Sequence, residues 1–167
     1  MVKTVLRKER KMTENTLVKT ALNKAMALCA RSEFCSGDIR VKLASWGLNN
    51  SDANSVISTL IKENFINDKR YTEAFVKDKF RHNKWGKVKI TAHLKAKNIE
   101  SELISSALSL LDDDQYRQMI RDMLNSHRKF VKAKNQFDLK GKLLRFGLSK
   151  GFESHILYDI LNEMEEK

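Results

Sequence analysis

The sequence contains no proline, and its 167 residues include only six glycines. Residues that break helices are therefore scarce. Long stretches place apolar residues at the three- and four-residue spacing of an amphipathic helix, and no segment shows the alternating pattern of a half-buried strand. We predict from this that the fold is all-α.

Cysteine is also rare, with only Cys29 and Cys35 in the chain. No apolar run approaches the ~18 residues that a membrane span needs. Residues 1–15 contain five basic residues, and no apolar stretch of a secretory signal follows them. We therefore expect a cytoplasmic protein with no membrane contact, in a reducing compartment where both thiols stay free.

The residue patterns that carry chemistry are missing as well. The glycines form no phosphate-binding loop, and the histidines at 82, 93, 127 and 155 lack the spacing of a metal site. Carboxylates cluster at residues 112–114 and near the C-terminus, but nothing positions a pair as general acid and base. We predict no catalytic residue, no metal, no cofactor and no enzymatic activity.

Basic charge, by contrast, is abundant. The formal net charge is +11 and the pI is about 9.7, which favours a polyanionic partner. Residues 65–111 contain ten basic and five acidic residues, the largest net share of the chain. Within them, residues 77–97 contain eight basic residues and a single acid, Asp78. This segment is the electrostatic centre of the chain.

The candidate DNA- or protein-binding residues are seven basic side chains in this segment and before it. They are Arg70, Lys77, Arg81, Lys84, Lys87, Lys95 and Lys97. Helical spacing places the first three on one stripe. Lys84, Lys87 and Lys95 lie within about 80° of each other if their helix extends back to Lys84, at ~100° per residue. Such stripes neutralise phosphates without reading sequence, and the alternative is a merely solvated face.

An internal repeat organises the chain. Trp46-Gly47-Leu48 aligns with Lys97-Asn98-Ile99 and Phe146-Gly147-Leu148, at offsets of 51 and 49 residues. Matched apolar columns accompany the alignment: Ile39, Ile90 and Leu139; Leu43, Leu94 and Leu143; Ile57, Leu108 and Leu157; Leu60, Leu111 and Ile160. Glycine and asparagine tolerate the left-handed conformation, so we predict that a helix ends at each of Gly47, Asn98 and Gly147.

The repeat predicts a basic, loosely ordered N-terminal arm (1–16) followed by three three-helix repeats, at 17–64, 65–111 and 112–167. The expected helices are 17–31, 36–46, 50–63, 68–83, 86–97, 101–111, 113–132, 138–146 and 152–165. Asn49, Glu100 and Ser149 occupy the predicted N-cap position of the third helix in each repeat. Because each unit is too small to bury much core alone, we expect an elongated, curved array of three tandem repeats.

A helix-turn-helix unit is an alternative interpretation of residues 36–66. Its recognition helix would lie at about 51–61, a segment without lysine or arginine. Helices that enter the major groove need donors for phosphates and guanine edges. A DNA-binding transcription regulator therefore remains the alternative function, and sequence-specific binding by this unit is disfavoured.

The residues of the second repeat resemble the RecX family. Residues 65–76 (FINDKRYTEAFV), Arg81, residues 86–90 (GKVKI) and residues 94–99 (LKAKNI) are similar to the signature of that family, and residues 30–31 and 36–43 add a weaker match. The resemblance covers about residues 17–165. Asn98 stands where glycine is common and Asp38 replaces glutamate, while the third repeat matches only in its apolar skeleton.

The resemblance implies a regulator of the RecA recombinase. Family members lie in the groove of the RecA–DNA filament and suppress ATP hydrolysis, strand exchange and coprotease activity, in recombination, DNA repair and the SOS response. Some also bind DNA directly. We thus expect a monomer whose partners are the RecA filament and single- and double-stranded DNA, bound without sequence preference. The resemblance implies no catalytic residue.

Overall fold

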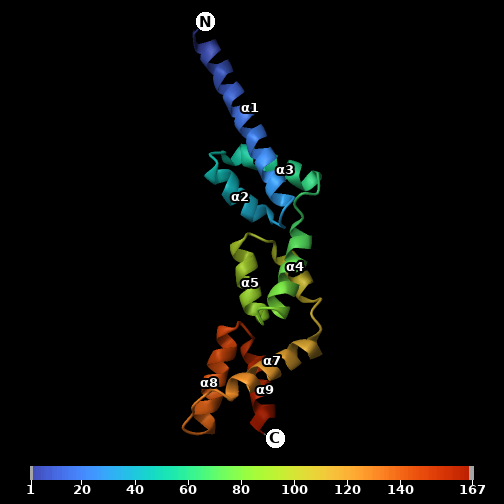
Figure 1. The fold of residues 1–167 in the computed structure, drawn as a ribbon, viewed down its shortest axis with the longest axis vertical. Coiled ribbons are helices and arrows are strands. Elements are labelled where there is room, and N and C mark those ends of the chain that lie inside the picture. The colour runs from blue at the N-terminus through green and yellow to red at the C-terminus, as the bar shows by residue number, and fades with distance from the viewer. Residues whose placement is uncertain (1, 166–167) are drawn as a thin grey trace. The chain divides into compact units, whose positions relative to one another are not determined.

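A computed structural model describes the backbone of residues 2–165 and the side chains of residues 15–165. Over these residues the chain forms nine α-helices and no strand (Figure 1), so the prediction of an all-α fold is confirmed. The helices are α1 Val2–Cys29, α2 Ser36–Ser45, α3 Asn50–Lys62, α4 Asp68–Arg81, α5 Lys87–Ala96, α6 Ser101–Leu108, α7 Asp113–Arg128, α8 Gln136–Ser149 and α9 Ser154–Glu165.

The first helix is longer than predicted. Whereas the sequence places its start near residue 17, α1 begins at Val2 and so includes most of the segment expected to be a loosely ordered arm. The side chains of residues 1–14 lie outside the described part of the structure. The other eight helices begin and end within a few residues of their predicted bounds.

Several helices begin at side chains that cap them. Asn49 accepts a hydrogen bond from the Asp52 N–H at 2.9 Å, as predicted, at the start of α3. Asp112 and Asn135 cap α7 and α8 in the same way, each at 2.8 Å. Glu100 occupies the predicted position before α6, but its side chain makes no capping bond. These caps satisfy amide groups that the first turn of a helix leaves unpaired.

The chain divides into two compact units, residues 1–71 and 72–167. In the first unit, α1, α2 and α3 enclose one apolar core. The fully buried side chains at its centre are Ile39, Leu43 and Leu60, at 0% exposure. Cys29 is half-buried against this core, and its thiol pKa is raised, chiefly by burial.

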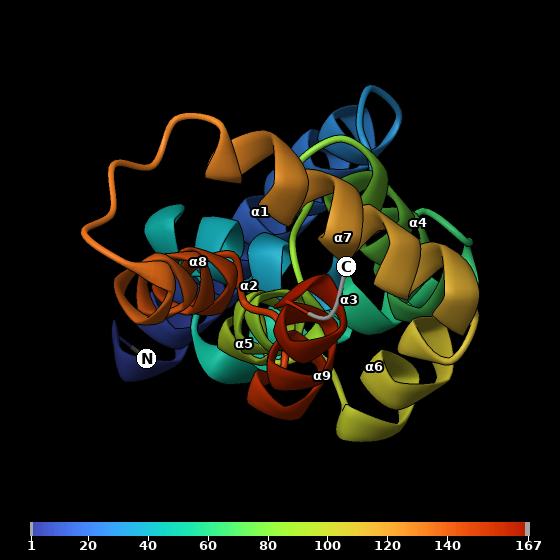
Figure 2. The same ribbon diagram turned by 90° about the horizontal axis from the view of Figure 1, so that it is seen from below.

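In the second unit, α7, α8 and α9 share a core with Phe80 of α4. Tyr116, Ile120 and Leu124 of α7 are almost completely buried in it. The connection between α7 and α8 runs as a long loop on the outside of this unit (Figure 2). Helices α5 and α6 contact each other, and Ile90 and Leu94 of α5 are fully buried.

The helix ends predicted at Gly47 and Asn98 are confirmed. Both residues are left-handed, with φ of 88° and 58°. In each case the amide that follows reaches back across the last turn: Leu48 N–H donates to Leu43 at 3.1 Å and Ile99 N–H donates to Leu94 at 3.2 Å. This is the Schellman arrangement, which satisfies carbonyl groups at the end of a helix.

The predicted helix end at Gly147 is wrong. Helix α8 continues through Gly147 to Ser149, and the left-handed residue is Gly151, with φ of 84°. The Phe152 N–H donates to the Gly147 carbonyl at 3.2 Å, and Phe152 is buried, whereas Leu148 is 45% exposed. Ser149 is accordingly part of α8 and does not cap α9. The third repeat therefore matches the others at Gly151, four residues later than predicted.

The start of α5 is bonded to the end of α8 within the second unit. Gly86 N–H donates to the Lys150 carbonyl at 2.9 Å, and Val88 N–H donates to the Gly151 carbonyl at 3.0 Å. Between them, Lys87 N–H donates to the Tyr116 hydroxyl at 3.0 Å. Three amides at the start of α5, which has no side-chain cap, thus find acceptors on other helices or helix ends.

Candidate nucleic-acid interface

Four of the seven predicted binding residues are basic side chains that are exposed to solvent. Lys77 and Arg81 lie on α4, Lys84 lies in the α4–α5 connection and Lys95 lies on α5; all four are exposed. None of them forms an ion pair with a carboxylate in the part of the chain whose side chains are described. Their charge is therefore available to an external anion. We call these four residues the α4–α5 basic surface.

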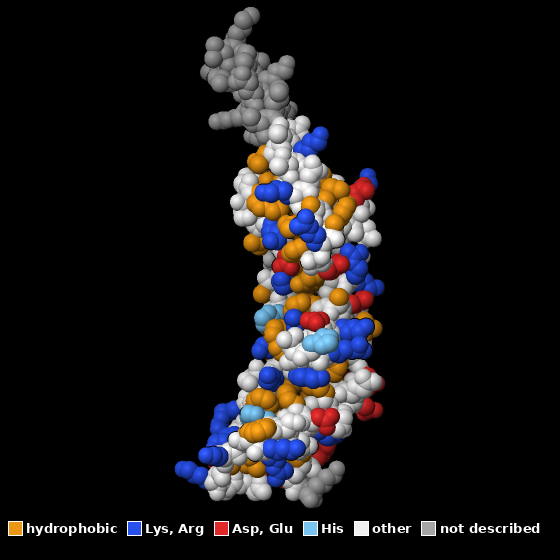
Figure 3. Space-filling view, in the orientation of Figure 1, with side chains coloured by type: hydrophobic (Ala, Val, Ile, Leu, Met, Phe, Trp, Pro, Cys, Tyr) orange, Lys and Arg blue, Asp and Glu red, His pale blue; other side chains and the backbone are white. Residues whose placement is uncertain are grey.

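A second group of cations surrounds Trp85 beside this surface. The ammonium groups of Lys79 and Lys89 lie 5.7 and 4.7 Å from the centre of the indole ring, and the His93 ring lies 4.5 Å from it. Lys79 also bonds to Asp78 at 2.9 Å, and this hydrogen bond lowers the pKa of that carboxyl. Figure 3 shows basic and histidine side chains near the middle of the view, where Figure 1 draws α4 and α5.

Lys79 and Lys89 belong to the basic segment 77–97, but their contacts with Trp85 were not predicted from the sequence. The sequence feature that indicates this arrangement is Trp85 itself, which follows Lys84 in the most basic stretch of the chain. A cation over the face of an aromatic ring is attracted electrostatically to that ring. The arrangement gives the surface a half-buried planar group as well as positive charge.

Lys87 does not belong to the open surface. Its ammonium group bonds to Asp113 at 3.2 Å and lies 4.7 Å from the centre of the Tyr116 ring. Its side chain is only 24% exposed. Lys87 therefore joins α5 to the start of α7, and its charge is partly compensated within the chain.

The predicted angular relation of Lys84, Lys87 and Lys95 is wrong. It required the helix to extend back to Lys84, but α5 begins at Lys87 and Lys84 is left-handed, with φ of 54°. Gly86, whose amide bonds to the end of α8, comes directly before this helix. The chain therefore turns at Lys84, and no helical spacing relates it to Lys95.

Arg70 and Lys97 complete the predicted set. Arg70 lies in the first compact unit, where its guanidinium bonds to Glu33 at 2.8 Å and to Asn64 at 3.2 Å. Lys97 is half-buried directly after the end of α5. Arg70 is exposed but paired with Glu33, and Lys97 is half-buried, so neither is counted with the α4–α5 basic surface.

Arg117 and Arg121, two basic residues of α7, are paired with carboxylates of α9. Arg121 bonds to Glu163 at 2.9 Å, and Arg117 lies 3.4 Å from Glu163 and 3.8 Å from Asp159. The hydrogen bond from Arg121 lowers the pKa of the Glu163 carboxyl. These pairs join α7 to α9, so the two arginines support the fold of the second unit.

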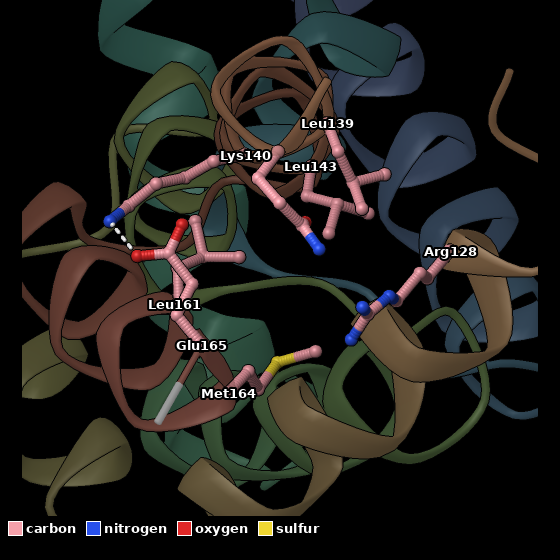
Figure 4. Close-up of a pocket in the computed structure, with 8 residues that line it drawn as sticks. Arg128, Leu139, Lys140, Leu143, Leu161, Met164 and Glu165 are labelled. Atoms are coloured by element: carbon pink, nitrogen blue, oxygen red, sulfur yellow. Dashed lines mark hydrogen bonds and ion pairs between the residues drawn. The ribbon is translucent and has the colours of Figure 1, made fainter. Parts of the chain in front are cut away.

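A cavity of about 420 Å³ lies between α7, α8 and α9 (Figure 4). Leu139, Leu143, Leu161 and Met164 give it an aliphatic lining. Its one carboxylate, Glu165, bonds to Lys140 at 2.7 Å. In the described residues, no group of three histidine, cysteine or acidic side chains is placed to hold a metal ion. Of the helices described, none is long and apolar enough to cross a membrane.

A family model described as "RecX, second three-helix domain" matches residues 67–108, which include the whole α4–α5 basic surface. The regulatory protein RecX of Clostridium beijerinckii is 29% identical over 142 residues, covering 84% of this chain and 66% of the relative. That of Clostridium botulinum (strain Eklund 17B) is 32% identical over 129 residues, covering 75% and 59%. The chain thus spans about two thirds or less of the length of these curated relatives.

Two solved structures share the fold. The crystal structure of RecX from Lactobacillus salivarius matches with a TM-score of 0.79 and 21% identity, covering 92% of this chain and 99% of that one. A second crystal structure, of a regulatory protein RecX, matches with a TM-score of 0.83 and 16% identity, covering 94% and 77%. At these identities the likeness shows the fold alone.

Proposed function

This chain belongs to the RecX family, and on that basis we propose that it binds the filament of the RecA recombinase on DNA and inhibits its activities. Those activities are ATP hydrolysis, strand exchange and coprotease activity. The chain would thereby regulate recombination and DNA repair. Its partners would be the filament and DNA of either strandedness, bound without sequence preference.

The observation that carries this proposal is the α4–α5 basic surface. Its four side chains are exposed and have no carboxylate partner among the described side chains, so an external polyanion can neutralise them. A filament of protein on DNA offers phosphates, and RecA subunits could offer acidic side chains. Phosphate contacts supply affinity without sequence information, which suits a partner that assembles on any DNA.

The exposed face of α3 supports a filament regulator over an operator-binding protein. Asn50, Ser51, Asn54, Ser55 and Ser58 are its exposed polar residues. The helix has no basic residue before Lys62, in its last turn. Recognition helices normally bring Arg or Lys to guanine edges and phosphates.

The DNA-dependent ATPase activity of the cognate RecA tests the proposal. We expect stoichiometric addition of this chain to lower the steady-state rate of ATP hydrolysis and to slow strand exchange. Unchanged rates in both assays would reject the proposal. Footprinting on genomic fragments separates the alternative, because an operator protected at nanomolar protein and physiological salt would indicate a transcription regulator.

A further inference from the structure

Residues 128–137, which we call the basic aromatic loop, run from the last residue of α7 through the first two residues of α8. They contain the two most exposed large apolar side chains in the part of the chain that the structure describes: Phe130 is 83% exposed and Phe137 is 86% exposed. Exposed aromatic rings forgo the free energy that burial would provide. Two of them in one short connection indicate a surface that is covered in a complex.

The aliphatic and the aromatic side chains of this loop point in different directions. Val131 is half-buried and packs against the core of α7, α8 and α9. The loop can therefore direct a large side chain inward, yet its phenylalanines point to solvent. The large apolar groups that it offers to a partner are thus aromatic rings only.

The loop is strongly basic. Arg128, Lys129, Lys132 and Lys134 are exposed, and residues 128–137 contain no acidic residue. None of these four side chains forms an ion pair with a described carboxylate. The next acid, Asp138, is compensated by Lys142 at 2.8 Å. At the lower left of Figure 3, basic side chains gather where Figure 1 draws this connection.

Hydrogen bonds from the start of α8 hold the loop in place. The Lys134 N–H donates to Asp138 at 3.0 Å, and the Lys142 ammonium donates to the Lys132 carbonyl at 2.8 Å. Asn135, a residue of the loop, caps the start of α8. A loop ordered in this way loses less conformational entropy when it binds a partner.

We propose that the basic aromatic loop binds single-stranded nucleic acid, with bases stacked on Phe130 and Phe137 and phosphates beside the lysines. Exposed rings interleaved with unpaired cations match the combination by which proteins bind single strands without reading sequence. A duplex hides its base faces and offers these rings no stacking partner. The proposal deepens the proposed function, which includes binding of single-stranded DNA, by assigning that binding to a site apart from the α4–α5 basic surface; its test requires no RecA.

Fluorescence anisotropy with a labelled oligo(dT) and the full chain tests the proposal. Replacement of both phenylalanines by leucine (F130L/F137L) keeps the apolar character but removes the ring faces. We expect this variant to bind oligo(dT) about five- to 100-fold more weakly, with little change in its salt dependence. The F130Y/F137Y variant should bind like the wild type. The K129A/K132A/K134A variant should instead flatten the salt dependence by roughly two units of log affinity per log salt.

Tyr158→Leu is the matched control, because this tyrosine lies on α9 and is 49% exposed. It should leave oligo(dT) binding unchanged, and F130L/F137L should leave duplex binding unchanged. Wild-type chain that fails to bind oligo(dT) at low salt, or F130L/F137L that binds it like the wild type, overturns the proposal. If that variant keeps oligo(dT) affinity but loses inhibition of RecA, the loop docks on protein instead. If F130L/F137L weakens oligo(dT) binding as expected but the wild-type chain does not inhibit RecA, only the proposed function is rejected.

Discussion

The hydroxyl group of Tyr116 donates a 2.6 Å hydrogen bond to the carboxylate of Glu153. The same oxygen accepts the Lys87 N–H at 3.0 Å, so one phenol joins α7 to the start of α5 and to the residue before α9. The ring is 1% exposed and lies 5.8 Å from the rings of both Phe80 and Phe152. Tyr116 therefore fixes the position of α5, which carries part of the α4–α5 basic surface.

We predict that Tyr116→Phe lowers the free energy of unfolding by about 1–3 kcal/mol. The variant keeps the packed ring but leaves the Lys87 N–H and the Glu153 carboxylate without this partner, which carries the desolvation cost of unsatisfied polar groups. Chemical denaturation followed by circular dichroism measures the change. Tyr158→Phe is the control, because that side chain is 49% exposed, and equal stability of the two variants would contradict the prediction.

The contribution of Tyr116 to the stability of the fold should also decrease at alkaline pH. Burial, and then the hydrogen bond to Glu153, raise the pKa of Tyr116 above its ordinary value of 10.0. The folded chain therefore holds the phenol proton more tightly than the unfolded chain does. The resulting stabilisation is fully present below about pH 10 and is lost as the pH rises further.

We accordingly expect the stability difference between wild type and Tyr116→Phe to be constant from neutral pH to about pH 9. Above pH 10 the wild type should lose stability faster than the variant, by up to ~1.4 kcal/mol per pH unit. Denaturation curves of both proteins up to pH 11 measure this. A difference that stays constant over the whole range would show that the phenol titrates alike in folded and unfolded chains.

Local sequence predicted some helix ends and missed another, for a physical reason. At Gly47 and Asn98 a residue that tolerates positive φ precedes an apolar one, and the helix ends there. Gly147 has the same neighbours, but a side chain at Gly147 would overlap Leu157, so this glycine serves close helix packing inside α8. Leu157 lies ten residues further along the chain, on α9, and the residue spacing of the repeat does not reveal this contact.

The sequence predicts where the candidate site lies, but not which side chains belong to it. The charge count placed it in residues 77–97, and Lys77, Arg81, Lys84 and Lys95 are indeed exposed there. The same count cannot distinguish Lys87, because its partner Asp113 lies 26 residues away. Whether a lysine forms an ion pair depends on tertiary contacts, and the number of lysines in a segment does not reveal those contacts.

Substitution of Gly86 or Gly151 by alanine should cost more than about 2 kcal/mol of stability. A methyl group on Gly86 would overlap the Gly151 carbonyl, and one on Gly151 would overlap Lys89 at a φ of 84° that alanine resists. Either change must separate α5 from the end of α8 and break the hydrogen bonds between them. Thermal unfolding of the full chain measures the loss.

Gly141→Ala is the matched control for these substitutions. Gly141 lies inside α8, and the nearest atom to an added methyl group is a guanidinium nitrogen of Arg145 at 3.8 Å. We expect this change to raise stability by about 0.5–1 kcal/mol, since alanine favours the helix over glycine. If Gly86→Ala and Gly151→Ala were as harmless as Gly141→Ala, the joint between α5 and α8 would not be a close contact.

The salt dependence of DNA binding tests the α4–α5 basic surface directly. Replacing Lys77, Arg81 and Lys95 by alanine removes three exposed charges that pair with no described carboxylate. If these side chains displace counterions from DNA, log affinity falls with log salt by about 0.9 per neutralised phosphate on a duplex and about 0.7 on a single strand. The triple variant should therefore flatten the slope by up to roughly two to three units and keep its helical content.

The control replaces Arg31, Arg40 and Lys42, three basic residues of the first compact unit. Arg40 bonds to Asn54 at 2.7 Å and Lys42 lies over the Phe34 ring, so at least two of these side chains already have partners. This variant has the same net charge as the triple variant of α4 and α5, which separates a local contact from a general loss of positive charge. An equal change of slope in both variants, or none in either, would mean that the α4–α5 basic surface is merely solvated.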